Sequence, residues 1–158
     1  MALGKGIRRL ALLTSLDLSR NWIGSGDAKN TTGTMTLGES IGRLALLRSL
    51  DLSRNWIGFR DAQNTTGTMA LGEGIGRLAQ LTSLDFAGNR IGYCDAQNTT
   101  GTMALGEGIG RLAQLMSLDL SGNFIGFGDD QNTTGTMALG KGIGRLAQLR
   151  SLYLALNK

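Results

Sequence analysis

The chain has 158 residues, 16 Lys and Arg, 12 Asp and Glu and a formal net charge of +4, which fits one domain or one short repeat array. It has no His and a single Cys, Cys94, which excludes a Ser-His-Asp triad, a Cys-His dyad, a Cys/His zinc site and an internal disulfide. No run approaches the roughly 18 consecutive apolar residues of a membrane helix. We therefore expect an ordered, soluble chain that is not an enzyme and has no metal and no cofactor.

The sequence repeats every 34 residues. Near-identical segments begin at five methionines, Met1, Met35, Met69, Met103 and Met137. Self-similarity at a fixed period of this size is typical of repeat arrays. We therefore expect one array that spans the whole chain, made of units 1–34, 35–68, 69–102 and 103–136 and a partial unit 137–158.

The first part of each unit has the spacing of a helix. In the third unit Leu71, Ile75 and Leu78 lie at i, i+4 and i+7, which places them on one helical face. Interior glycines such as Gly72 and Gly74 each cost about 0.5–1 kcal/mol relative to Ala. Such a helix would be stable only when it packs against neighbouring units, and we expect its glycines to let adjacent segments approach closely.

The next part of each unit alternates like a strand. Leu50 and Leu52 fall on one face and Asp51 on the other, so stacked units would form a parallel sheet with the leucines inward. The outer face then carries a row of aspartates, Asp17, Asp51, Asp85 and Asp119. Like charges at a strand spacing of about 4.8 Å are unfavourable unless they are solvated or countered. We interpret the row as solvated and aided by nearby arginines; calcium bridging is the alternative.

An asparagine follows each strand at the same repeat position: Asn21, Asn55, Asn89, Asn123 and Asn157. We expect these side chains to bond backbone groups where the chain turns. The segment Leu47-x-x-Leu50-x-Leu52-x-x-Asn55-x-Ile57 resembles the leucine-rich repeat, LxxLxLxxNxL. With the helical segment it is most similar to the ribonuclease-inhibitor-like class, which implies an α/β solenoid with one parallel β-strand and one convex helix per 34-residue repeat. A tetratricopeptide array shares the period, but its two long helices do not suit a chain with no Pro and strings of glycine.

That class has units of about 28 residues, within the leucine-rich range. The extra six match Gln-Asn-Thr-Thr-Gly-Thr, which we interpret as a polar loop inserted between strand and helix. Each Asn-Thr-Thr in it is an N-glycosylation acceptor in a secreted protein, which predicts glycans on Asn30, Asn64, Asn98 and Asn132. The alternative is a plain turn in which Thr34 and its equivalents cap the next helix.

Six of the eight aromatic residues lie just after the strands: Trp22, Trp56, Phe59, Tyr93, Phe124 and Phe127. We expect them to pack the loop layer, with lateral contacts to another array or stacking on a sugar as the functional alternative. Cys94 is interpreted as a surface thiol, with an intermolecular disulfide as the alternative.

Two features favour a structural role. Neither end shows an evident polar capping repeat, and the sheet-face positions are nearly identical from unit to unit. The last unit departs from this pattern with Tyr153 and Leu156, as residues of an end contact would. We therefore expect a non-enzymatic solenoid that stacks head to tail with copies of itself into an extracellular, N-glycosylated fibre.

The alternative is a protein-recognition module, the commonest role in the leucine-rich family. Recognition would require exposed sheet positions that differ between units, whereas variation is confined to edge positions such as Thr14, Arg48, Thr82, Met116 and Arg150. We expect no nucleic-acid partner, because acids dilute the basic residues in every repeat, and no membrane partner.

Overall fold

The structure, a computed structural model, describes residues 6–25, 28–59, 62–91, 99–126 and 133–157. Short strands alternate with longer helices along the chain. The elements are β1 (Ser15–Asp17), α2 (Ala28–Ile41), β2 (Ser49–Asp51), α3 (Ala62–Ile75), β3 (Ser83–Asp85), α4 (Thr99–Ile109), β4 (Ser117–Asp119), α5 (Thr133–Ile143) and β5 (Ser151–Tyr153).

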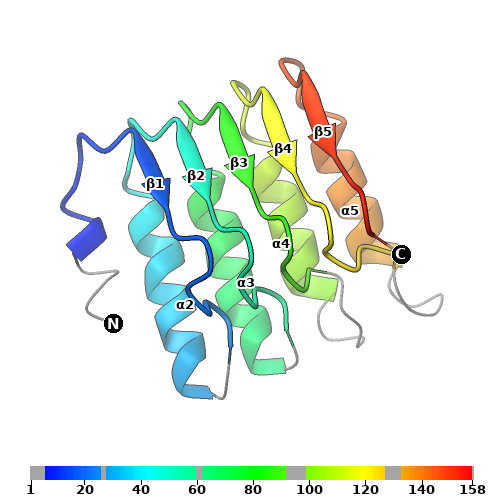
Figure 1. Ribbon diagram of the computed structural model, residues 1–158, viewed down its shortest axis with the longest axis horizontal. Helices are drawn as coiled ribbons and strands as arrows, with labels where there is room; N and C mark the ends of the chain where they lie inside the picture. Colours follow the sequence, from blue (N-terminus) through cyan, green and yellow to red (C-terminus); the bar gives the residue numbers. More distant parts are fainter. Residues whose placement is uncertain (1–5, 26–27, 60–61, 92–98, 127–132, 158) are drawn as a thin grey trace.

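The five strands form one parallel sheet in the order β1-β2-β3-β4-β5. Each strand pairs with its neighbour without any offset in the repeat, so that Leu16 lies beside Leu50 and Leu50 beside Leu84. Figure 1 shows the strands in one row and the helices in a second row along one side of the sheet, with the chain ends at opposite ends of the array. This confirms the expected α/β solenoid with one strand and one helix per repeat.

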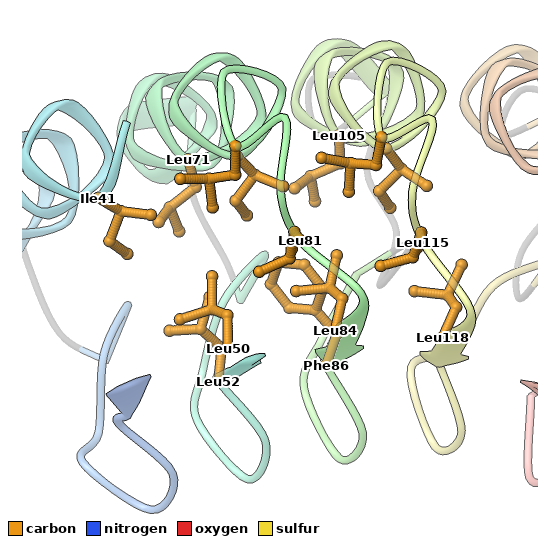
Figure 2. Close-up of a cluster of buried hydrophobic side chains, with 14 of the residues drawn as sticks. Ile41, Leu50, Leu52, Leu71, Leu81, Leu84, Phe86, Leu105, Leu115 and Leu118 are labelled. Atoms are coloured by element: carbon orange, nitrogen blue, oxygen red, sulfur yellow. The ribbon is translucent and has the colours of Figure 1, made fainter. Parts of the chain in front are cut away.

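The core lies between the two rows. Ile41, Leu71 and Leu105 point from the helices toward strand leucines such as Leu50 and Leu118 (Figure 2), and all five are at most 1% exposed. Because successive side chains of a strand point to opposite faces, the leucine of each of the inner strands β2, β3 and β4 is buried while its serine and aspartate face outward. Burial of this continuous leucine layer holds together units that could not bury an apolar face alone.

The helices approach one another closely at glycines. A Cβ atom added to Gly72 would lie 2.5 Å from the carbonyl oxygen of Ala104, on the next helix, and Gly106 has the same relation to Ala138. Real Cβ atoms essentially never come so near to backbone. The expectation that glycines permit close packing of adjacent segments is confirmed.

The inserted segment is helical, which corrects the prediction of a loop. Helices α2 and α3 begin at Ala28 and Ala62, before the Asn-Thr-Thr sequence, and α4 and α5 begin within the segment at Thr99 and Thr133. The alternative role of Thr34 as a helix cap is also wrong, because this residue lies in the interior of α2 and is 3% exposed. Packing of such threonines into the interior outweighs the weak helix propensity of Asn, Thr and Gly.

Two glycines at the same repeat position provide a matched test of helix packing. Gly106→Ala should lower the free energy of unfolding by about 1–3 kcal/mol, because its methyl group would lie 2.7 Å from the Ala138 carbonyl. Gly140→Ala should instead raise it by about 0.5–1 kcal/mol, because no described atom lies within 4 Å of the added methyl. Urea unfolding of the two variants measures both effects, and a stabilised Gly106→Ala protein would contradict the close approach.

Candidate functional site

The outer face of the sheet carries the row of aspartates in direct register. Asp17 pairs with Asp51, Asp51 with Asp85 and Asp85 with Asp119. Each carboxylate accepts a hydrogen bond through Oδ1 from the backbone N–H two residues later, at 2.8 Å in Asp51 and 2.7 Å in Asp85. These bonds fix the carboxylates at the ends of their strands, so the row is rigid as well as regular.

The row affects the ionisation of its members. Partial burial raises the pKa of Asp85, and the charges of Asp51 and Asp119 raise it further, while the Ala87 N–H and Arg54 act in the opposite direction. At the end of the row the pKa of Asp17 is lowered, chiefly by hydrogen bonds from Ser19. Burial is thus the main cause at Asp85, the neighbouring carboxylates add to it, and Arg54 is one arginine that counters the row.

The asparagines form a second ladder beneath the sheet edge. Asn55 donates through Nδ2 to the carbonyl of Leu18, at 2.9 Å, and accepts through Oδ1 from the N–H groups of Asn21 and Ile23. Equivalent bonds to the preceding unit are made by the asparagines of the later units, Asn89, Asn123 and Asn157. Asn21 in the first unit donates to Ser19 of its own unit. The ladder thus joins each unit to the unit before it.

Aromatic rings and one arginine stack along the loop edge. The rings of Trp22 and Trp56 are stacked with centroids 6.0 Å apart, and Phe59 meets Trp56 edge-on at 4.7 Å. The guanidinium of Arg90 lies 5.0 Å from the ring centroids of both Trp56 and Phe124, within cation–π range. Sequence reasoning missed Arg90, although it lies 34 residues after Trp56 and so has the same repeat position. Tyr93, Phe127 and Cys94 lie outside the described residues.

Both end units expose leucines that inner units bury. Leu152 and Leu154 in the last unit are 40% and 46% exposed, whereas their equivalents two units earlier, Leu84 and Phe86, are 1% and 0% exposed. In the first unit Leu10 is 50% exposed, while its equivalent Leu44 is fully buried. Strands β1 and β5 also lie at the two edges of the sheet. The first and last described units therefore lack the neighbouring unit that covers the same positions in the inner units.

Comparison with known proteins identifies the repeat. A family model described as the leucine rich repeat matches residues 10–30 and 44–60, which include the strands β1 and β2 and their asparagines. The matched segments are leucine-rich repeats. The chain's 34-residue unit of one strand and one helix is the unit that the sequence predicted.

One solved structure similar to this leucine-rich repeat protein is a leucine-rich repeat protein of Leptospira interrogans, with 18% sequence identity and a TM-score of 0.27. The match covers 96% of this chain and 51% of the other, so the chain spans about half the length of that relative. No curated protein matches the chain.

Two of the four predicted glycosylation acceptors lie near the starts of described helices. Asn30 and Asn64 belong to the backbone of α2 and α3, while Asn98 and Asn132 lie outside the described residues. No site for a metal of three or more acidic, His or Cys side chains occurs in the described ranges. None of the described helices is both long enough and apolar enough to cross a membrane.

The helix row of the leucine-rich repeat protein also carries grooves that sequence reasoning missed. Three of them, with volumes of about 200, 340 and 330 Å³, lie between successive helices from α2 to α5. Each groove is lined by a methionine, an arginine and either a glutamate or a lysine at equivalent repeat positions. In the groove between α3 and α4 these residues include Met103, Glu107 and Arg111. Because glycine has no side chain, it leaves space for these grooves, which cannot be recognised before the packing of the helices is known.

Replacement of Asp85 and of Asp17 by asparagine should change the free energy of unfolding at neutral pH in opposite directions. The folded-state pKa of Asp85 is raised above its ordinary value of 3.8. Its contribution to the free energy of unfolding is therefore fully present below pH 3.8 and is lost as the pH rises through the folded-state pKa. Asp85→Asn keeps an acceptor for the Ala87 N–H and removes the charge, so it should stabilise the protein at neutral pH by about 0.5–1 kcal/mol. This gain should disappear as pH falls toward 3.8.

The matched control is Asp17→Asn. The pKa of Asp17 is lowered, so its carboxylate contributes stability above the ordinary value and loses it as pH falls. This variant should therefore be destabilised at neutral pH, with a loss that shrinks in acid. Unfolding curves across the acid range, from about pH 3 to neutral, compare the two. Identical pH profiles would show that the middle of the row is no different from its edge.

Proposed function

We propose that this leucine-rich repeat protein is a structural solenoid that associates head to tail with further copies of itself. The observation that carries the proposal is the single register shared by all four strand pairs, which gives a periodic sheet that a second copy can continue. Family members are typically non-enzymatic modules that mediate protein–protein interactions, and here the proposed partner is a second copy of the chain.

The interior of the array supplies the geometry of the proposed contact. Four successive strand pairs share one register, so β1 of a second copy can continue the sheet beyond β5 in the same way. Leu152 and Leu154 would then be covered as Leu84 and Phe86 are covered within the chain. A contact of this kind leaves both outer ends open again, and repetition of an interface that does not close gives a filament.

Uniformity of the sheet face favours self-association over recognition of a varied partner. Ser83 and Asp85 on β3 are repeated as Ser117 and Asp119 on β4, so a ligand on this face would meet the same groups at every step. A filament needs no such variation, since its periodic surface follows from the repeat itself.

Gly140 provides the sharpest test of head-to-tail association. In inner units the equivalent Gly72 lies against the carbonyl of Ala104 in the next unit, and no described atom occupies that space beside Gly140. The wild-type chain should form oligomers that grow with concentration in sedimentation velocity and appear as filaments by electron microscopy. Gly140→Ala should weaken this association at least about tenfold, because within the array a methyl group at the equivalent Gly72 would meet the backbone of the next unit.

Gly33→Ala is the control, because it also adds a methyl in a space without described neighbours within 4 Å, but on α2, at the end of the first unit. It should associate like the wild type. A wild-type chain that stays monomeric up to its solubility limit would overturn the proposal, and capture of a different protein on the sheet face would then become the leading interpretation.

We further propose that the fibre is extracellular and carries N-linked glycans, on the basis of the four Asn-Thr-Thr acceptors. The acceptors of α2 and α3 lie at the N-terminal ends of these helices, away from the strand edges that the end contact uses. Material from a eukaryotic secretory host should lose mass on treatment with a peptide N-glycosidase, with Asn30, Asn64, Asn98 and Asn132 converted to Asp in peptide mass spectra. Unmodified asparagines in secreted material would contradict this part of the proposal.

A further inference from the structure

The connections from helix to strand lie along one edge of the array. Figure 1 shows them at the edge where the strands begin, opposite the edge where the helices begin. We call it the connection edge; its described segments are 8–14, 42–48, 76–82, 110–116 and 144–150. These segments contain none of the 12 acidic residues of the chain. They do contain eight exposed arginines: Arg8, Arg9, Arg43, Arg48, Arg77, Arg111, Arg145 and Arg150.

Folding separates charges that the sequence mixes within each repeat. Asp51 and its equivalents lie at the opposite ends of the strands. The Cδ atom of Arg77 lies 3.3 Å from the position that a Cβ atom of Gly42 would take, so this arginine reaches back over the connection of the preceding unit. Glu73 shares a groove with Arg77 and counters part of its charge, whereas Arg48 lies beyond the helix, next to a strand. The connection edge is therefore basic.

Two units also expose a leucine on this edge. Leu46 is 44% exposed although described units lie on both sides of it, and its equivalent Leu12 is 83% exposed. The neighbouring Leu44 and Leu47 are fully buried, so the exposure belongs to this one position. In the later units the same position is glutamine: Gln80, Gln114 and Gln148. The core therefore does not require a leucine at this position.

The units that expose a leucine also carry additional arginines. Arg8 has the repeat position of Gly42, and Arg48 has the position of Thr14. Exposed leucines and additional positive charges thus coincide on one part of the connection edge. A surface that binds to anionic lipids has this composition, because its apolar side chains enter the headgroup boundary while its basic side chains are attracted to the charged lipids.

We propose that the connection edge of the first two units binds an anionic lipid surface through Leu12 and Leu46 and through arginines that include Arg8 and Arg48. This inference is independent of the proposed head-to-tail association. It departs from the expectation of no membrane partner, which concerned segments long enough to cross a bilayer. Binding at the surface of a bilayer needs no such segment.

The composition of the edge favours lipid over a nucleic acid or another soluble polyanion. Single-stranded nucleic acids stack on aromatic side chains, and the five segments contain no Phe, Trp or Tyr. The stacked rings of Trp22 and Trp56 lie past the other ends of the strands. An exposed leucine gains free energy when it leaves water for a bilayer boundary, whereas it gains nothing from a phosphate. Asn30 and Asn64 belong to the helix starts at the opposite edge, so glycans there would leave this contact open.

The test measures co-sedimentation with phosphatidylcholine vesicles that contain or lack phosphatidylglycerol. The wild type should bind only the anionic vesicles. Arg8→Gly and Arg48→Thr introduce residues that other units have at the same positions, and each should weaken binding about fivefold at low salt. Arg20→Gly is the matched control, because it removes the same charge and introduces the residue of Gly88, but past the other end of β1. It should weaken binding by less than about twofold.

The leucines should supply the part of the affinity that salt does not remove. Leu12→Gln combined with Leu46→Gln should weaken binding about tenfold. This ratio to the wild type should persist as salt is raised, whereas the effects of the arginine variants should shrink, because screening weakens interactions between exposed charges. Gln80→Leu extends the exposed leucine row by one unit and should strengthen binding about threefold. Thermal unfolding of each variant shows whether the fold is intact.

Three results would overturn the proposal. Equal binding to the neutral and the anionic vesicles, or binding to neither, would exclude an anionic lipid surface as the partner. An equal loss for Arg20→Gly and Arg8→Gly would show a response to net charge and not to the connection edge. Unchanged binding of the double leucine variant, together with tighter binding of the wild type to heparin, would assign the edge to a soluble polyanion. None of these results bears on head-to-tail association, which is measured separately.

Discussion

The arrangement depends on a mismatch of spacing that glycine removes. Neighbouring strands lie about 4.8 Å apart, whereas packed helices ordinarily need about 8–10 Å. A solenoid with one strand and one helix per unit must therefore either curve strongly or thin its helices. Here Gly72 and Gly106 bring each helix against the backbone of the next. Because the helix row can follow the sheet so closely, every strand keeps the same register, and the rows of asparagine and aspartate are consequences of that register.

The sequence was sufficient for the strands and the core, because each side-chain role appears several times in one chain. Alternation in Ser49-Leu50-Asp51 and its copies predicted which side chains face inward, and the position of Asn55 predicted a backbone-bonding role. The inserted Asn-Thr-Thr-Gly-Thr segment was misjudged because its local propensities favour a turn. Only the buried position of Thr68, which depends on the neighbouring helices, shows why it is helical. Arg90 was missed because a charged residue does not stand out among aromatic ones until their rings are seen to stack on it.

The differences between units carry more functional information than their similarities. Inner units are nearly interchangeable on the sheet face, so they describe a surface with one repeating character. The last described unit departs from them at Tyr153 and Leu156. A leucine-rich repeat that recognises a varied partner would instead distribute its distinctive residues over the sheet.

The asparagine ladder has a further consequence for how the array unfolds. Asn55 and Asn89 each satisfy backbone groups of the unit before them, so a unit that detaches leaves polar groups unpaired on its neighbour as well as on itself. Stability is then shared between nearest neighbours, as in a one-dimensional cooperative chain. Opening should proceed from the terminal units inward, with the slowest amide exchange at β3 in the middle of the array. Each further copy added at an end would move that frayed boundary outward, so that length itself becomes a source of stability.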